Sequence, residues 1–207
     1  LVLALSLAVG LGVPARAADT GAEQSYEKAA VFTVEALPAP KVSSIGGEWA
    51  VIGLRRGGAG APEGYYQTYY AALEGYTAQR GGVLHEKKYT EHSRAILAVT
   101  ALGRDARDVA GHDLTLPLGD YDKTVWQGVN GPIWALIALD SGDYPIPANT
   151  GAETQATRQM YIDYILNGQL PDGSWSLSGG GDPDLTAMAL TALARYRQQG
   201  AVQAAVD

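Results

Sequence analysis

The chain has 207 residues, of which 46% are hydrophobic and 18% charged, a composition typical of globular rather than disordered proteins. Its formal net charge of −7, without any cluster of basic residues, argues against nucleic acid and anionic membranes as partners. Cysteine is absent, which excludes disulfides, thiolate nucleophiles, internal thioesters and cysteine-bound zinc.

The first residues, 1–17, read LVLALSLAVGLGVPARA and have the pattern of the remainder of a secretory signal peptide. An apolar segment over residues 1–13 is too short to span a bilayer, and Ala15-Arg16-Ala17 fits an A-x-A cleavage site. The alternative is a buried N-terminal helix. We expect a chain exported to the cell surface or the medium, with no membrane span in its mature part. An acidic, cysteine-free exported protein favours a bacterial source.

The rest of the chain predicts helices and no strands, because its apolar residues recur with a period near 3.6 rather than two. Residues 18–25 are polar and are expected to be loose. Helices are expected over residues 26–37, 47–56, 65–80, 89–103 and 122–140, the last restarting near Asn130-Gly131-Pro132. Residues 57–64, 104–121 and 141–151 are expected to be loops.

Residues 158–196 predict a helical hairpin. The first helix has apolar residues at helical spacing and ends in a Gly- and Pro-containing segment, residues 168–173. Glycines 179–181 allow the chain to reverse, and Asp182-Pro183 is a strong helix start, with a carboxylate N-cap and proline at the first position. The second helix is apolar on several sides, so we expect protein to cover more than one of its faces.

An internal repeat extends this hairpin to the whole chain. The tetrapeptides VIGL (51–54), VTAL (99–102), LIAL (136–139) and LTAL (190–193) each lie late in an apolar helix that follows a more polar one. This pattern predicts a helical-hairpin repeat with loops of variable length. Residues 201–207 are expected to begin a further helix. A closed ring of hairpins needs more chain than this, so we expect the sequence to stop within the ring.

The hairpin also carries a motif. Tyr164-Ile165, Gln169, Gly173 and Trp175 match the pattern aromatic-aliphatic-x-x-x-Q-x-x-x-G-x-W, which resembles the QW motif of squalene cyclases and their relatives. The chain is therefore similar to the prenyltransferase/squalene-oxidase repeat of the α/α toroid superfamily, most clearly over residues 89–197. Its central part looks closer to uncharacterised toroid domains of bacterial surface proteins.

This resemblance implies an all-α fold, with residues 18–207 forming an α/α toroid as an incomplete ring of about four helical hairpins. Gln169, Gly173 and Trp175 are expected to be structural. The glutamine can bond free backbone groups at a helix end, the glycine permits the chain reversal, and the tryptophan can cover the hairpin.

Asp182 and Asp184 are the catalytic candidates. The stretch DPDLTAMALTAL resembles the inner-helix start that reads Asp-x-Asp-Asp-Thr-Ala in class II terpene cyclases, where the middle aspartate protonates the substrate. Asp182 and Asp184 match the first and second aspartates, which would make Asp184 the proton donor, but Leu185 replaces the third. The structural alternative is that Asp182 caps the helix and Asp184 favours the positive end of its dipole.

Binding candidates lie at the starts of the inner helices, which would gather at one mouth of a toroid. They are His92, Trp126, Asn130, Trp134 and Thr186. The resemblance suggests a small hydrophobic molecule, a corrinoid or a glycan as ligand, and no residue specifies a cofactor. The three histidines have no paired metal-binding spacing, so no metal site is predicted.

Two other sets point weakly to carbohydrate chemistry. His92 lies near Tyr89 and Arg94, and Tyr/His/Arg sets serve lyases on α/α toroids. Asp120 and Asp122 form a close carboxylate pair of the kind that a glycosidase uses, although a helix cap and a solvated loop residue are the simpler interpretation.

Together these observations favour a ligand-binding or interaction module of an exported bacterial surface protein. A terpene-cyclase-like isomerase is the second hypothesis, weakened by Leu185 and by a content of one phenylalanine and four tryptophans, which is low for a cation-stabilising cavity. A polysaccharide lyase or hydrolase is the third.

Overall fold

The computed structural model describes residues 20–58, 60–62 and 64–207, so the expected signal peptide over residues 1–17 lies outside the described residues. The described part is built from helices, which confirms the all-α class. Within it, extended pairing is limited to two isolated bridges, Val109 with His112 and Asp120 with Gln155. No helix in these ranges has the length and apolar content to cross a membrane.

The helices follow one another along the chain with short or irregular connections. They are α1 (Thr20–Ala36), α2 (Ile45–Gly57), α3 (Tyr65–Gln79), α4 (Thr90–Ala101), the short 3-10 helix η1 (Leu116–Gly119), α5 (Tyr121–Val125), α6 (Asn130–Ser141), α7 (Arg158–Asn167), α8 (Pro183–Leu193), the 3-10 turn η2 (Ala194–Tyr196) and α9 (Gly200–Val206).

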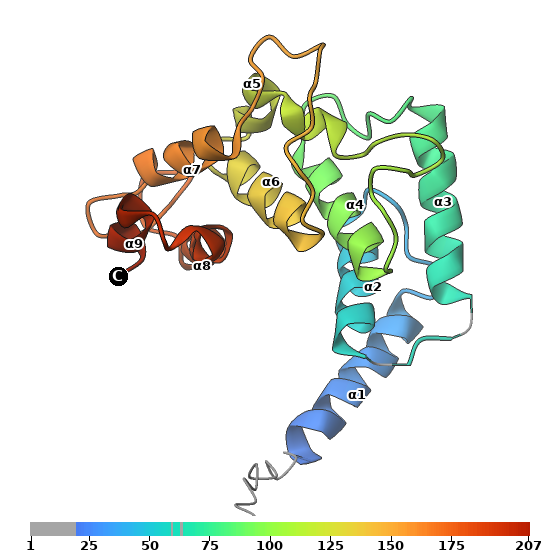
Figure 1. The fold of residues 1–207 in the computed structure, drawn as a ribbon. Coiled ribbons are helices and arrows are strands. Elements are labelled where there is room, and N and C mark those ends of the chain that lie inside the picture. Colours follow the sequence, from blue (N-terminus) through green and yellow to red (C-terminus); the bar gives the residue numbers. More distant parts are fainter. Residues whose placement is uncertain (1–19, 59, 63) are drawn as a thin grey trace, which may run out of the picture.

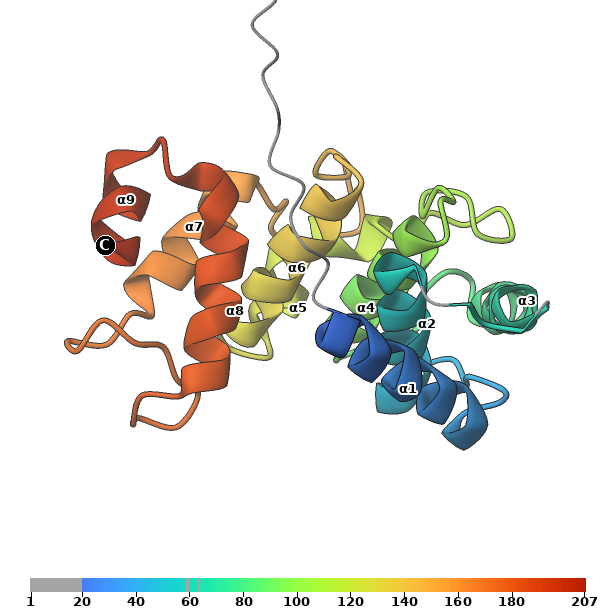
Figure 2. The same cartoon turned by 90° about the horizontal axis from the view of Figure 1, so that it is seen from below.

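Four helices that alternate along the chain form a continuous row. α2 packs against α4, α4 against α6, and α6 against α8. The recurring tetrapeptides lie in these four helices, except that the last residue of VTAL, Leu102, is the C-cap of α4. Figures 1 and 2 show the row running through the middle of the molecule, with α3 and α9 at opposite ends. α1 packs on α2, and α9 packs on α7 and α8.

The centre of this row forms the hydrophobic core. Ile96 and Val99 of α4 and Leu136 and Leu139 of α6 are fully buried. α6 is apolar around most of its circumference because α4, α7 and α8 all pack against it. The predicted coverage of the inner helices on several sides is therefore seen most clearly at α6.

Two expectations about loops are wrong. Residues 20–25 form the first turns of α1 and are not a loose segment. Ser25 Oγ donates to the Gly21 carbonyl at 2.8 Å within these turns. A helix that is exposed to solvent needs no apolar stripe, so its sequence lacks the usual helical pattern. Residues 104–121 do not form a purely polar loop. They include η1, and Leu114 and Leu118 anchor the segment in the core with fully buried side chains.

The expected helix over residues 122–140 is interrupted where a restart was predicted. α5 ends at Val125 and α6 begins at Asn130. Gly131 lies against the backbone of α5, where a Cβ atom would come within 1.8 Å of the Thr124 carbonyl oxygen. The absence of a side chain at Gly131 therefore lets the two helices meet.

Candidate functional site

The residues of the QW motif brace the hairpin of α7 and α8. Trp175 is fully buried, and its Nε1 atom donates to the carbonyl oxygen of Ile165 at 2.6 Å. Gln169 Nε2 donates to the carbonyls of Gly173 at 3.0 Å and of Ala205 at 2.8 Å, which ties the loop to the last turn of α9. Gly173 has a φ of 84°, a conformation that glycine adopts without strain. The side-chain N–H groups of Gln169 and Trp175 thus all bond backbone carbonyls.

The two catalytic candidates lie at the start of α8. Asp182 is its N-cap, and its Oδ1 atom accepts from the backbone N–H groups of Asp184 at 2.9 Å and Leu185 at 3.0 Å. Both aspartates are exposed. The Asp184 side chain is therefore open to solvent in the first turn of α8 and is not enclosed by a cavity wall. Nearby, Thr186 Oγ1 accepts from the backbone N–H of Trp175 at 3.0 Å, so this predicted ligand-binding side chain holds the hairpin.

His92 lies inside the protein. Its side chain is fully buried, and Nε2 accepts from the backbone N–H of Leu84 at 3.1 Å. Burial lowers the pKa of the imidazole to about 3, so the ring is neutral at physiological pH. The ring packs edge-on against the buried Tyr89, with centroids 5.4 Å apart. Arg94 points instead to glutamates of α2 and α4, so the expected Tyr/His/Arg set does not gather on an accessible surface.

The remaining predicted residues lie in different environments and do not form one site. Asp120 is buried and caps α5 by accepting from the Lys123 N–H at 3.1 Å, whereas Asp122 is exposed. The Trp126 ring is 59% exposed, with the Lys87 ammonium 5.9 Å from its centroid. Asn130 is the first residue of α6 and is half-buried.

Trp134 is the predicted residue that lines a cavity. Its ring lies against that of Trp49, with centroids 5.3 Å apart and planes at 57°. Trp49 is on α2 and Trp134 on α6, and α4 packs between these two helices. The two side chains meet over α4, so the row of helices is concave on this side.

The cavity on this concave side is the inner-face cavity, with a volume of about 530 Å³. All four helices of the row and η2 contribute to it. Its lining residues are Trp49, Ile52 and Arg56 of α2, Leu97 of α4, Trp134, Ile137, Asp140 and Ser141 of α6, Thr191 and Ala192 of α8, and Arg195 of η2.

At one end of the inner-face cavity, Asp140 is held in a network. Its Oδ1 atom lies 2.8 Å from Nη2 of Arg158, and its Oδ2 atom accepts from the Tyr196 hydroxyl at 2.7 Å. Burial, together with Asp140, raises the pKa of Tyr196 to about 12. Arg195 donates to the Asp140 carbonyl and pairs with Asp143.

The other cationic residue of the cavity, Arg56, is exposed and makes no ion pair among the described residues. The floor of the cavity is aromatic and aliphatic, formed by the tryptophan pair together with Ile52, Leu97 and Ile137. A guanidinium at the rim of such a floor provides a polar anchor for a mainly hydrophobic molecule.

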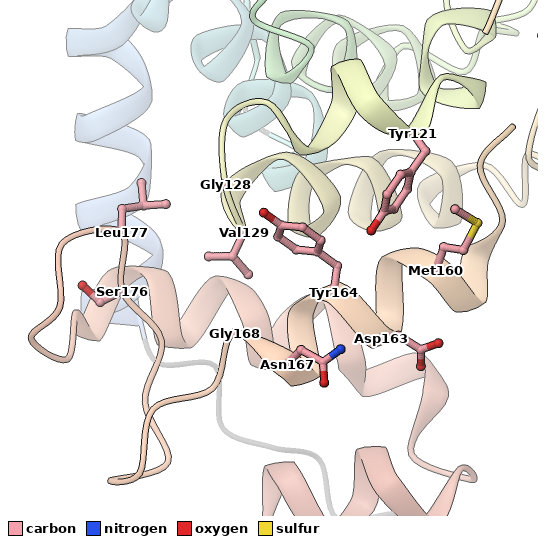
Figure 3. A pocket seen from close by; sticks show the side chains of 10 residues that line it. All are labelled: Tyr121, Gly128, Val129, Met160, Asp163, Tyr164, Asn167, Gly168, Ser176 and Leu177. Carbon is pink, nitrogen blue, oxygen red and sulfur yellow. The ribbon is translucent and has the colours of Figure 1, made fainter. Parts of the chain in front are cut away.

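A second pocket, the tyrosine groove, has a volume of about 720 Å³ and is shown in Figure 3. Four of its residues follow one face of α7, and the others come from the α5–α6 region and from the loop before α8. They are Met160, Asp163, Tyr164, Asn167 and Gly168, with Tyr121, Gly128 and Val129 and with Ser176 and Leu177.

None of these groove residues was a predicted ligand-binding residue. The available signal was the spacing of Met160, Asp163, Tyr164 and Asn167, which places polar and aromatic groups on one helical face. The predicted apolar residues of this helix included Met160 and Tyr164 together with Tyr161 and Ile165. The structure buries Tyr161 and Ile165, whereas Met160 and Tyr164 are half-buried and line the groove.

Comparison with known proteins identifies no relative of this chain. No family model matches the chain, and no curated protein or solved structure matches it at a significant level. In the part of the chain that the structure describes, no group of three or more His, Asp or Glu side chains is arranged to hold a metal ion. The resemblance to QW-repeat proteins stays a prediction.

Proposed function

We propose that this chain is a ligand-binding module of an exported bacterial surface protein, built as an incomplete α/α toroid related to squalene cyclase and prenyltransferase repeats. The observation that carries the proposal is the inner-face cavity, to which all four helices of the row contribute side chains. In a toroid the inner helices surround a central lumen, and the concave side of the row corresponds to the wall of that lumen. The module binds its ligand there.

The ligand class that suits this wall best is a small hydrophobic molecule. Trp49 and Trp134 offer ring faces at the centre of the cavity, and the neighbouring aliphatic side chains extend this surface. Arg56 at the rim favours a ligand that carries an acidic or strongly polar group at one end. Corrinoids and glycans are the other two classes to be tested.

The enzymatic alternatives receive less support. Asp184 is exposed at the start of α8, and its neighbour Asp182 serves as the helix cap. His92 is buried and neutral, so a lyase cannot use it as a surface acid or base without opening the fold. We therefore propose that the module acts without cyclase or lyase chemistry.

The test is a ligand screen by thermal shift, followed by calorimetry on each hit. Hydrophobic acids, sterols, corrinoids and oligosaccharides are compared, and a hit should raise the melting temperature in proportion to ln(1 + [L]/Kd). The variants Trp49→Ala and Trp134→Ala should weaken binding by about tenfold or more, since an aromatic anchor contributes on the order of 1–2 kcal/mol. Phe32→Ala, which removes a 70% exposed ring on α1, is the matched control.

Two results would contradict the proposal. Binding that survives both tryptophan substitutions would place the ligand elsewhere, and conversion of squalene or a prenyl diphosphate by the protein, abolished in Asp184→Asn, would replace binding by catalysis. Export is tested separately in the source cell. The mature chain should be found outside the cytoplasm with Ala18 at its N-terminus.

A further inference from the structure

The tyrosine groove shares no lining residue with the inner-face cavity, and the proposed function does not use it. It opens along the exposed face of α7. In Figure 3 the rings of Tyr121 and Tyr164 stand above that helix, with Leu177 across the groove and Asp163 and Asn167 below.

Two aromatic rings form the upper wall of the groove. The centroids of Tyr121 and Tyr164 are 6.4 Å apart, and their planes meet at 75°. Tyr121 also stacks on Tyr161, at 6.0 Å and 20°. Tyr161 is fully buried, and its hydroxyl donates to the Leu118 carbonyl at 2.7 Å. The wall is thus held in place from inside the protein, so a ligand would meet an ordered surface.

The groove is electronegative and contains no compensating cation. No lysine or arginine lines it. Asp163 is exposed, accepts from Gln159 Nε2 at 2.8 Å, and has no ion pair among the residues that the structure describes. The basic residues closest to it in sequence on α5 and α7 are engaged elsewhere, since Lys123 pairs with Asp120 at 3.4 Å and Arg158 with Asp140.

The pKa of Tyr121 reflects the same surroundings. Burial raises it first, and Tyr164 and the carboxylates of Asp122 and Asp163 raise it further. The Tyr121 phenol therefore stays neutral, and of the two aspartates Asp163 lines the groove together with it. A ring face carries a negative quadrupole, so the ring and the carboxylates attract the same sign of charge.

Apolar groups complete the pocket. Met160 lies at one end, and Val129 and Leu177 lie at the other. A ligand that fits both parts presents a positive charge surrounded by methyl or methylene groups, because such a cation contacts ring faces without losing strongly held water. We propose that the tyrosine groove is a second binding site, which takes a small organic ammonium ion of the trimethylammonium type, free in solution.

The test compares two molecules of the same shape. Choline carries a quaternary nitrogen, and 3,3-dimethylbutan-1-ol has carbon in its place and no charge. In calorimetry or chemical-shift titration of the whole chain, choline should bind about tenfold or more tightly than the neutral analogue, as a partly desolvated cation–π contact predicts. Choline affinity should fall as salt rises, since the groove is open to solvent.

Substitutions locate the site. Asp163→Asn and Tyr164→Ala should each weaken choline binding by about threefold to tenfold. Tyr164→Phe keeps the ring and should retain most of the affinity. Glu153→Gln removes one negative charge from an exposed position outside the groove and is the control for net charge. Trp134→Ala should leave choline affinity unchanged, which separates this site from the inner-face cavity.

Three results would overturn the proposal. Equal affinity for choline and its neutral analogue would show that the positive charge does not contribute to binding. No binding of choline at tens of millimolar would show that the groove is not an ammonium-binding site. Binding to phosphatidylcholine vesicles without binding to free choline would assign the ammonium group to a lipid surface. A circular dichroism spectrum identical to that of the unmodified chain confirms that Tyr164→Ala is folded, and Asp163→Asn provides a second, isosteric variant if it is not.

Discussion

The guanidinium of Arg94 joins α4 to α2, because its Nε atom lies 3.2 Å from Oε2 of Glu48 inside the protein. Glu48 is almost fully buried, and its carboxylate also accepts from the backbone N–H groups of Ser43 at 2.7 Å and Ser44 at 3.2 Å. The hydroxyl of Tyr69 approaches it at 3.3 Å. One carboxylate thus links the start of α2 to α3 and α4.

Removing the arginine should leave this carboxylate buried without its counterion. We expect Arg94→Met to lower the free energy of unfolding by about 3 kcal/mol, measured by urea denaturation, because a buried charge that loses its partner keeps its desolvation cost. The double variant Glu48→Gln/Arg94→Met should recover part of the loss. Arg107→Met, which breaks an exposed pair with Asp105, is the control and should change stability little. A loss in Arg94→Met no larger than in Arg107→Met would show that the pair does not hold the helices together.

The two aspartates at the start of α8 should differ in their effect on stability. Asp182→Ala removes the acceptor of two backbone N–H groups and should lower the free energy of unfolding by about 1 kcal/mol. Asp184→Ala removes only a favourable interaction with the helix dipole and should cost less than about 0.5 kcal/mol. Chemical denaturation of the two variants side by side measures the difference. Equal losses would mean that Asp184 has a structural contact of its own.

The fold class and most helix positions could be predicted from the sequence because period and caps are local properties. Asp182-Pro183 predicts the start of α8, and Asn130-Gly131-Pro132 predicts the start of α6 after a break. The packed segment around Leu114 and Leu118 was missed, since its burial depends on α4 and other distant elements rather than on a periodic pattern. The helical structure of residues 20–25 was not predicted, because a helix exposed to solvent on all sides lacks the apolar residues at helical spacing by which helices are recognised.

The candidate sites could be predicted only in part. Trp134 was predicted as a ligand-binding residue, but its contact with Trp49 depends on how α2, α4 and α6 pack. The residues around His92 in the sequence do not indicate whether its side chain is exposed. Its burial results from packing against other elements of the fold. The tyrosine groove combines residues from three separate segments, so no spacing along the chain shows it.

Burial of His92 should make stability depend on pH. The imidazole has a folded-state pKa of about 3 because burial disfavours the charged ring, whereas the unfolded chain binds the proton near pH 6.5. The unfolded state therefore takes up a proton first as the pH falls. The contribution of His92 is fully present above pH 6.5 and is lost progressively toward pH 3, with a slope of up to about 1.4 kcal/mol per pH unit.

His92→Gln tests this assignment. The amide oxygen of glutamine can accept from the Leu84 N–H as Nε2 does, but it does not titrate. The free energy of unfolding is measured for both proteins between pH 7.5 and 4.5, and the variant should show the shallower decline. His85→Gln, at a half-buried position nearby, is the control. Parallel curves for His92→Gln and the unmodified chain would show that other groups cause the acid sensitivity.

Two helical glycines should respond to alanine in opposite directions. A Cβ atom on Gly53, within α2, meets nothing within 4 Å beyond its own helix backbone, so Gly53→Ala should raise the free energy of unfolding by up to about 1 kcal/mol through helix propensity. A Cβ atom on Gly131 would lie 1.8 Å from the carbonyl oxygen of Thr124, and this backbone atom cannot rotate away as a side chain can. Gly131→Ala should therefore lower the free energy of unfolding by about 2 kcal/mol or more, because α5 and α6 must separate.

Thermal and urea denaturation of Gly53→Ala and Gly131→Ala measure how one added methyl group changes the free energy of unfolding at each position. An unchanged m-value would show that both variants unfold from a native state of the same extent. If Gly131→Ala were as stable as Gly53→Ala, α5 would have to pack less closely on α6 than the structure shows. In that case the position of Tyr121, which α5 carries to the tyrosine groove, would also have to differ, and choline titration of Gly131→Ala would detect the change.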